Sequence, residues 1–570
     1  MSPTVSLRAG TAARAGPDRS VVRHTVPMTV RSRPGRGALL AGALAALALA
    51  GCTSGRPTPA SGTASVTTRP AARPAAAPAF PAAAERARPG DPNWSVVKVG
   101  GQHDIEGYTD HDSVLPGQPV RLFVSTIAHH VRVRAYRMGW YGGTRARLVW
   151  QSAPVPTRLQ AAARVTGPTH TPSAPWRPTL TVPTTGWPAG DYLLRLDTDR
   201  GALRRFVPLT VRTATNRGAV VLVNADTTWQ AYNAWGGYSL YHGPDGARAD
   251  RSRAVTFDRP YDYGAGTADF LGAELPAVAL AEKLGLRLGY ATDVDLQRDP
   301  GLLAGASAVI SLGHDEYWSP DMRAALTRAR DAGTNIAFLG ANAIYRKIRF
   351  GGTALGPDRL EINYKDDTDP IGRTDPAQVT TQWRDPPSSD NESRLTGTDY
   401  GCSPVRAPMV VVDPGSWLFA GLGLSAGSRL PGLVGSEYDR VYLGAPTPRP
   451  IEVLTHSPLV CDGRADAAEA AYYTTRSGAA VFDSGTSDWV AGLDSPTPVV
   501  RRVVTGVTTR LLEAFATGPA GRAHPARDTA PRYRQSLRRV PGVLRPTARR
   551  PPPPRRPAPA AACGRPRSAG

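Results

Sequence analysis

Four consecutive residues near the middle of the chain, His314, Asp315, Glu316 and Tyr317, carry an imidazole, two carboxylates and a phenol. Carboxylate and phenolate oxygens are ligands of hard cations such as ferric iron, and a bound metal lets water attack a carbonyl at neutral pH. Without a metal, Glu316 or His314 is a candidate general base. We take these four residues as the candidate catalytic group. A polar loop between a strand and a helix explains the same residues equally well.

The elements that must position this group can be read on either side of it. Residues 308–312 are a short apolar run with β-branched members, which predicts a strand covered on both faces. Gly313 ends the run, and Ser319 followed by Pro320 is the pattern that opens a helix. In an open α/β sheet, ligands bind beyond the carboxyl ends of the strands, which is where residues 314–317 would lie. Polar and aromatic residues also follow other expected strands and predict a convergent pocket; they lie at residues 224–233, 290–295 and 485–489.

Other catalytic arrangements find less support in the sequence. A thiol hydrolase of the glutamine-amidotransferase type needs a cysteine at the turn after its central strand, and here that turn contains none. The letters of a serine-nucleophile turn occur at residues 423–427, but the Leu-Pro-Gly of residues 430–432 prevents the helix that must follow. A metal-free carbohydrate-active enzyme using Asp315 and Glu316 is a third possibility, although neighbouring residues of a strand point apart.

The formal net charge of +21 belongs mainly to the two ends of the chain. Residues 1–90 contain 12 Arg and two acidic residues, and residues 522–570 contain 13 Arg and one acidic residue. The region between them is therefore close to neutral. A groove that binds nucleic acid needs positive charge on the folded surface, so we expect no nucleic-acid partner.

The N-terminal region predicts export. A basic stretch over residues 28–36 precedes an apolar run over residues 37–50, which is short for a membrane span and suits a signal peptide. Translation from Met28 would give the same signal. The sequence Leu-Ala-Gly-Cys ending at Cys52 is typical of a bacterial lipobox, so we interpret residues 1–52 as a signal peptide with a lipobox. We expect an extracytoplasmic protein, anchored to the cell membrane by lipidated Cys52; an ordinary secretory peptide is the alternative.

Cysteine usage is consistent with export, which makes disulfides possible. Of the four cysteines, Cys52 would be lipidated and Cys563 lies in a Pro/Arg-rich tail. Cys402 and Cys461 remain, and we predict that they pair. The sequence has no Cys-x-x-Cys or His-x-x-x-His spacing, so a structural zinc site is not expected.

Composition and patterning divide the rest of the chain. Residues 53–92 are a Pro/Ala-rich linker, and residues 519–570 have few core formers and predict a disordered basic tail. Residues 93–213 alternate with period two between turn signals, which predicts an immunoglobulin-like β-sandwich. Residues 214–518 alternate strands and helices, which predicts an α/β domain with a mostly parallel sheet. Strand-rich insertions are expected between residues 352 and 475.

Several segments, taken in order, resemble the C-terminal domain of the large (beta) subunit of N,N-dimethylformamidase over about residues 215–515. They are residues 290–296, 313–319, 338–343 and 381–384, and Gly485-Thr486 with Trp489. The resemblance implies a glutamine-amidotransferase-like α/β core without the cysteine, and a small companion subunit. It also implies mononuclear iron held by two tyrosines and a glutamate. Tyr317 and then Tyr290 are the matching tyrosines; the residues just before Trp383, where the family pattern has its glutamate, include no carboxylate.

Two functions are carried forward. The first is a lipid-anchored extracellular hydrolase that cleaves a C–N amide-type bond in a small amide or an envelope-derived substrate. Its site would centre on Tyr317, facing a hollow that solvent reaches. The second is a non-catalytic cell-surface protein that binds a glycan or an envelope polymer through aromatic residues. The aromatic candidates are Trp140, Tyr141, Trp229, Trp235 and Tyr238.

Overall fold

A seven-stranded mixed sheet carries the strand ends at which the sequence places its polar residues. The structure is a computed structural model that describes residues 82–96, 98–101 and 103–532. The expected signal peptide, Cys52 and most of the linker over residues 53–92 lie outside the described residues, as does the chain from residue 533.

The strand order of this sheet is β14-β12-β15-β17-β27-β26-β23. Neighbouring strands from β14 to β27 pair in parallel, whereas β26 pairs antiparallel with both β27 and β23. The strands are β12 (Val220–Asn224), β14 (Leu288–Thr292), β15 (Ala308–Leu312), β17 (Asn335–Leu339), β23 (Ile451–Val453), β26 (Ala471–Thr474) and β27 (Ala480–Asp483). Every residue of the five parallel strands is buried, which explains why they read as continuous apolar runs.

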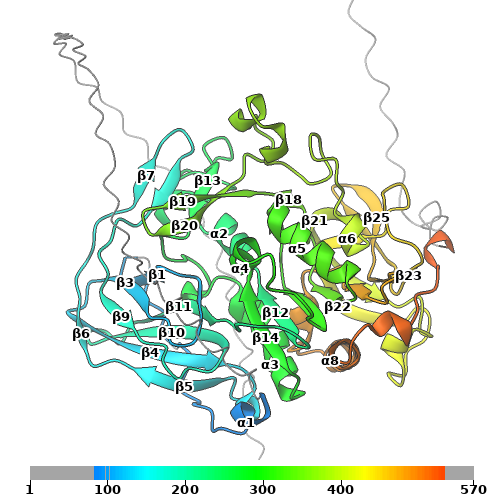
Figure 1. Cartoon of the computed structure of the whole chain (residues 1–570), viewed down its shortest axis with the longest axis horizontal. Helices are drawn as coiled ribbons and strands as arrows, with labels where there is room; N and C mark the ends of the chain where they lie inside the picture. Colours follow the sequence, from blue (N-terminus) through cyan, green and yellow to red (C-terminus); the bar gives the residue numbers. More distant parts are fainter. Residues whose placement is uncertain (1–81, 97, 102, 533–570) are drawn as a thin grey trace, which may run out of the picture. The chain divides into compact units, whose positions relative to one another are not determined.

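Alternate side chains of these strands enter two separate hydrophobic cores. Leu222 and Ile310 pack against helices α3 and α8 on one face of the sheet. Val221 and Val309 pack against helices α4 and α5 on the other (Figure 1). These helices are α3 (Leu275–Lys283), α4 (Asp293–Arg298), α5 (Pro320–Asp331) and α8 (Pro498–Ala516). The α/β class predicted for this region is therefore present, with a mixed sheet.

Helix α5 begins where its sequence predicts. The Ser319 side chain accepts a hydrogen bond from the Met322 backbone N–H at 3.2 Å, and Pro320 is the first helical residue. Gly333 follows the last turn with a φ of 105°, a conformation that glycine adopts without strain. The N-cap fixes the point at which the chain leaves the candidate catalytic group.

Two facing β-sheets with a shared core precede the α/β region. One contains β1, β3 and β9, and the other contains β2, β11, β10, β4 and β5. Their bounds are β1 (Ile105–Thr109), β2 (Ser113–Val114), β3 (Val120–Thr126), β4 (His130–Met138), β5 (Ala146–Gln151), β9 (Leu180–Val182), β10 (Gly190–Thr198) and β11 (Arg204–Val211). Val120, Leu122 and Val124 of β3 share their core with Val133 of β4 and Leu194 of β10. This spacing of two is the periodicity seen in the sequence.

Buried polar contacts join the β-sandwich to the α/β region. Arg137 of β4 forms an ion pair with Glu282 of α3 at 2.5 Å, and both side chains are at most 1% exposed. Tyr141, in the glycine-aromatic stretch after β4, is buried and donates a hydrogen bond to Glu85 at 2.7 Å. Trp229 and Trp235 are only 4% and 1% exposed. These three side chains pack inside the protein and are not available to a glycan, whereas the other two candidates, Trp140 and Tyr238, are partly exposed.

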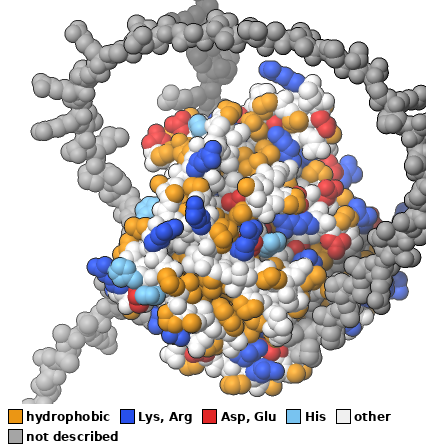
Figure 2. Space-filling model, turned by 60° about the vertical axis from the view of Figure 1, so that its left-hand side comes forward, with side chains coloured by type: hydrophobic (Ala, Val, Ile, Leu, Met, Phe, Trp, Pro, Cys, Tyr) orange, Lys and Arg blue, Asp and Glu red, His pale blue; other side chains and the backbone are white. Residues whose placement is uncertain are grey.

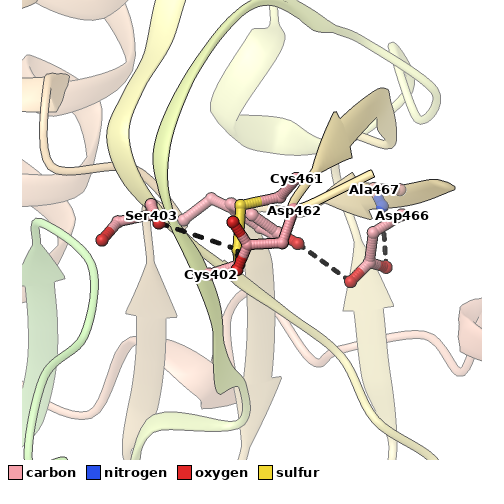
Figure 3. The surroundings of a disulfide bond; sticks show 7 residues. Cys402, Ser403, Cys461, Asp462, Asp466 and Ala467 are labelled. Atoms are coloured by element: carbon pink, nitrogen blue, oxygen red, sulfur yellow. Dashed lines mark hydrogen bonds between the residues drawn. A yellow bond between two sulfur atoms is a disulfide. The ribbon is translucent and has the colours of Figure 1, made fainter. Parts of the chain in front are cut away.

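Strand-rich insertions lie between β17 and β26, and one of their strands reaches the candidate catalytic group. β21 (Asp399–Val410) and β22 (Arg429–Arg440) form a hairpin, and β24 (Ser457–Cys461) and β25 (Arg464–Ala468) form another. The disulfide between Cys402 and Cys461 ties the first hairpin to the second, with a Cα–Cα distance of 6.3 Å (Figure 3). The two cysteines expected to pair are thus joined in the structure.

The described part of the chain extends beyond both expected domain limits. Within the expected linker, α1 (Ala82–Arg86) is held by an ion pair between Glu85 and Arg147. Within the expected tail, residues 519–532 pack on the sheet, where the backbone carbonyl of His524 accepts a hydrogen bond from Tyr472 at 2.7 Å. These residues are folded because they supply buried partners, which composition alone does not reveal.

Two surface properties follow from the described residues. None of the helices within residues 82–532 combines the length and the apolar character needed to span a bilayer. On the face shown in Figure 2, basic and acidic side chains are interspersed with hydrophobic ones, and no continuous basic stripe crosses that face. This distribution agrees with the near-neutral charge of the region between the ends.

Candidate active site

The turn after β15 is shaped by two glycines on neighbouring strands. Gly313 has a φ of 61°, and a Cβ on Gly340, just past β17, would lie 1.7 Å from the Gly313 carbonyl oxygen. Because any side chain at Gly340 would collide with backbone, the two strand ends approach closely only with glycine there. The chain then runs through residues 314–316 into β16 (Tyr317–Trp318), which pairs with β18 (Arg346–Lys347).

Asp315 and Glu316 point in different directions. The Asp315 carboxylate accepts hydrogen bonds from Ser311 Oγ and Trp318 Nε1, each at 2.6 Å, and is fully buried. Burial raises the pKa of Asp315 to about 6, next to the buried carboxyl group of Asp293. Asp315 therefore supports the turn from behind. It does not join Glu316 in one site.

One carboxylate oxygen of Glu316 accepts hydrogen bonds from two tyrosine hydroxyls. Tyr232 and Tyr241 both donate hydrogen bonds to Glu316 Oε2, at 3.0 and 2.9 Å. Tyr232 is the last residue of α2 (Asp226–Tyr232), and Tyr241 lies in the loop that follows, with their rings stacked 4.2 Å apart. Arg346 Nε lies 3.5 Å from the other oxygen, Glu316 Oε1. Burial and the Glu316 charge raise the pKa of each phenol well above 10.

Tyr317 is buried behind these phenols. It is 0% exposed, so it does not face the solvent-reachable hollow that was expected of it. Lys365 Nζ donates a hydrogen bond to Tyr317 Oη, and Tyr317 Oη in turn donates to Tyr241 Oη at 2.7 Å. Burial and the nearby Arg346 guanidinium hold the pKa of Lys365 well below 10.5. A chain of hydrogen bonds thus runs from Lys365 through Tyr317 and Tyr241 to Glu316.

His314 is the member of the tetrapeptide that reaches the surface. Its side chain is 17% exposed, and its Nε2 lies 3.1 Å from Glu437 Oε2 and 3.5 Å from Glu316 Oε2. Burial alone would lower the pKa of His314, but the charges of Glu437 and Glu316 outweigh it and raise that pKa to about 9. Glu437 comes from β22, so the insertion places the counter-charge of this imidazole.

The neighbouring strand ends complete the wall beside His314. The side-chain amide of Asn342, after β17, lies 3.5 Å from His314 Nε2. The Asn342 backbone N–H donates to Asp439 Oδ1 at 2.8 Å, and Asp439 interacts with the buried Asp483 at the end of β27. Burial raises the pKa of Asp483 to about 7. The buried carboxyls of Asp439 and Asp483 thus support the loop that carries Asn342, as Asp315 supports the turn after β15.

Tyr290, the second tyrosine suggested by the family resemblance, lies elsewhere. Its hydroxyl donates to Glu282 at 2.6 Å and accepts from Arg137 at 3.3 Å, within the core that joins the sandwich to α3. Tyr290 and Tyr317 share none of these hydrogen-bond partners, so the structure does not assemble them as a ligand pair. The phenols that meet Glu316 are Tyr232 and Tyr241 instead.

Sequence reasoning missed four residues of the site: Tyr232, Tyr241, Lys365 and Glu437. Tyr232 lies in the polar segment 224–233 that follows β12, so that segment gave a signal for it. The other three come from loops or insertions and have no local pattern that marks them.

Tyr232, Tyr241 and Glu316 are the residues that could hold a hard metal ion, since they bring two phenol oxygens and a carboxylate to one point. These are the donor types that the resemblance implied, but they stand at other residues than Tyr317 and Tyr290. Among the described residues, a group of cysteine and aspartate side chains also lies close together, at Cys402, Cys461 and Asp462. Its two sulfurs are bonded to each other, so they are not available as thiolate ligands (Figure 3).

The fold and the site define an α/β protein with a phenol-carboxylate site at the carboxyl edge of its sheet. Residues 132–502 match the family described as N,N-dimethylformamidase beta subunit-like, C-terminal, and the chain belongs to that family. The match begins in β4, well before residue 215, so part of the sandwich is included in it. A search of curated proteins finds no match.

Proposed function

We propose that this protein hydrolyses a C–N amide-type bond at the site built around Glu316. The observation that carries the proposal is the convergence of Tyr232 and Tyr241 on Glu316 Oε2, at 3.0 and 2.9 Å, beside the His314–Glu437 ion pair. Membership of the N,N-dimethylformamidase beta subunit-like family supports hydrolase chemistry. The substrate would be a small amide or an amide of the cell envelope.

Tyr232, Tyr241 and Glu316 would hold the mononuclear iron that the family resemblance implies. When bound, iron would supply Lewis-acid chemistry, polarising a carbonyl and acidifying water. Because burial raises the pKa of both phenols, they keep their protons unless a cation replaces them. Iron binding should therefore release protons. The hydrogen bonds that now join the phenols to Glu316 orient all three side chains toward one point.

His314 and Glu437 would carry the proton transfers of the reaction. Water adds to the carbonyl carbon, the C–N bond breaks, and the nitrogen leaves with a proton from His314 Nε2. The proton lost by the attacking water returns to His314 through Glu437, which gives a carboxylic acid and an amine. Glu437 keeps His314 protonated near neutral pH, as a general acid requires. Lys365 and Tyr317 are linked to Glu316 through the hydroxyl of Tyr241, so we assign them as positioning residues.

The proposal is tested on the purified full chain by iron analysis, visible absorption and hydrolysis of a panel of amides. We expect bound iron, a phenolate-to-iron absorption band, and amine release from at least one amide. Tyr232→Phe and Tyr241→Phe should each weaken the band and the activity. Tyr345→Phe is the matched control, because Tyr345 makes no hydrogen bond to Glu316 in the described structure. A metal-free protein, or an iron-loaded protein that cleaves no amide, would refute the proposal.

We also propose that the protein is exported and anchored by lipidated Cys52. The disulfide between Cys402 and Cys461 supports an oxidising compartment. Radiolabelled fatty acid should label the protein in its native host, and Cys52→Ser should move it from the membrane to the soluble fraction. Labelling of the Cys52→Ser variant would contradict the anchor.

The finer fold assignments belong with these proposals. The parallel order of β14, β12, β15 and β17 supports a glutamine-amidotransferase-like core, and the two facing sheets before it support an immunoglobulin-like sandwich. A small companion subunit is proposed from the family alone. Native mass measurement of the protein purified from its host would show the added mass.

A further inference from the structure

A small cavity lies between the β-sandwich and the α/β region, apart from the candidate active site. It measures about 30 Å³, enough for one or two water-sized groups. Asp191 of β10 lines it from the sandwich, and Asn224 and Asp226 line it from the end of β12 and the start of α2. These three residues are between 2% and 3% exposed.

The cavity presents hydrogen-bond acceptors that have no donor. Asp191 Oδ2, Asn224 Oδ1 and Asp226 Oδ2 are buried and lack a hydrogen-bond partner within the described chain. The second polar atoms of the Asp191 and Asn224 side chains bind each other, because Asn224 Nδ2 donates a hydrogen bond to Asp191 Oδ1 at 2.7 Å. This hydrogen bond fixes the orientation of both side chains. Unpaired buried acceptors cost free energy that a matching donor would recover.

The two carboxyls form no ion pair with a basic side chain of the described chain, although the charge of Arg137 acts on Asp191 from a longer distance. Arg259 also lines the cavity, but its donors go to the oxygens of Gln230 and to backbone carbonyls, including that of Trp235 at 2.9 Å. Burial raises the pKa of Asp191 to about 6 and that of Asp226 well above its usual value.

Aromatic rings form part of the remaining lining. Trp229 makes edge-to-face contacts with Tyr261 and Phe270, with ring centroids 6.0 and 6.3 Å apart, and all three rings line the cavity. Aromatic faces attract ammonium-type cations, whereas Mg²⁺ and Ca²⁺ require six or more oxygen ligands around them. Unpaired acceptor oxygens and aromatic rings in one small cavity match an N–H-bearing cation.

We propose that this cavity binds a small ammonium-type cation, ammonium or methylammonium. Its N–H groups would donate to Asp191, Asn224 and Asp226, and its charge would lie beside the rings. The proposed binding site and its ligand are inferred from the residues of this cavity. They do not depend on the proposed hydrolase activity. The bound cation would join the sandwich to α2 across their interface.

The test compares the full chain in ammonium, methylammonium, potassium and choline chlorides at one ionic strength, by thermal unfolding and by calorimetric titration. We expect ammonium and methylammonium to raise the melting temperature and to give saturable heats, whereas potassium and choline do neither. Asp191→Asn and Asp226→Asn should abolish the shift. Asp199→Asn, just beyond the exposed end of β10, is the matched control and should keep it.

Three results would overturn the proposal. The first is a titration of the unmodified protein without saturable heat, which would leave the cavity to water. The second is stabilisation by potassium equal to that by ammonium, which would indicate a metal-ion site. The third is a shift that survives in folded Asp191→Asn and Asp226→Asn. Because the first two use the unmodified protein, misfolding of a variant does not affect them.

Discussion

Replacing Tyr317 by phenylalanine tests the hydrogen-bond chain behind the phenols. Tyr317 Oη is the acceptor that the described structure gives Lys365 Nζ, and Lys365 is only 1% exposed. In Tyr317→Phe the amine stays buried without an acceptor. Leaving a buried polar group unpaired costs about 1–3 kcal/mol, so we expect Tyr317→Phe to lower the free energy of unfolding by about 2 kcal/mol.

A second substitution separates this cost from the loss of the phenol itself. Lys365→Met removes the amine and keeps most of its volume, while Tyr317 still donates to Tyr241 at 2.7 Å. We expect Lys365→Met to cost about 1 kcal/mol or less. In the double variant no amine is left unpaired, so its cost should fall short of the sum of the single costs by about 2 kcal/mol.

The assay is urea unfolding of the four proteins that make up this double-mutant cycle. Equal denaturant slopes are needed for the comparison, because an altered slope indicates a change in the surface exposed on unfolding. Additivity of the two substitutions within about 0.5 kcal/mol would refute the reasoning. It would show that Lys365 does not depend on the Tyr317 hydroxyl.

Three further predictions concern elements that hold the site. Removing the disulfide in a Cys402→Ser, Cys461→Ser variant opens a link between residues 59 apart in sequence, and should lower the free energy of unfolding by about 4 kcal/mol; equal stability of oxidised and reduced protein would contradict this. Ser319→Ala removes the N-cap of α5 and should cost about 1 kcal/mol, with Ser319→Asp expected to restore it in thermal unfolding. Burial raises the pKa of Asp483 to about 7, so the folded state binds more protons than the unfolded state above pH 4, and stability should fall as pH rises toward 7. Asp483→Asn should flatten that fall, and an unchanged slope would show that Asp483 does not titrate there.

The central strands and the capped helix could be predicted because their signals are local. Residues 308–312 are apolar at four of five positions, which is enough to specify a buried strand, and the prediction matches β15. The N-cap Ser319 and the glycine at position 333 act through their own turns of chain, so the bounds of α5 followed from nearby sequence. The sheet beneath the site was therefore visible in the sequence.

The site itself was only partly predictable because its partners come from distant segments. His314 and Glu316 were identified from one motif, but Glu437 reaches His314 from β22, across more than a hundred residues. Tyr241 lies in a loop without periodicity, so neither its stacking nor its hydrogen bond could be read from spacing. The role of Tyr317 was overestimated for the opposite reason. Its local motif is strong, but a motif does not show to which side of a short strand the side chain points.

The divergence of Asp315 and Glu316 shows how one short turn serves two purposes. Because adjacent residues of extended chain point to opposite sides, only one of the two carboxylates can face the phenols. The inner carboxylate of Asp315 binds Trp318 and Ser311, which fixes the backbone on both sides of Glu316. That fixed backbone lets Glu316 accept from two phenols without moving. An isosteric Asp315→Asn change should therefore disturb the site through position and not through charge at the reacting centre.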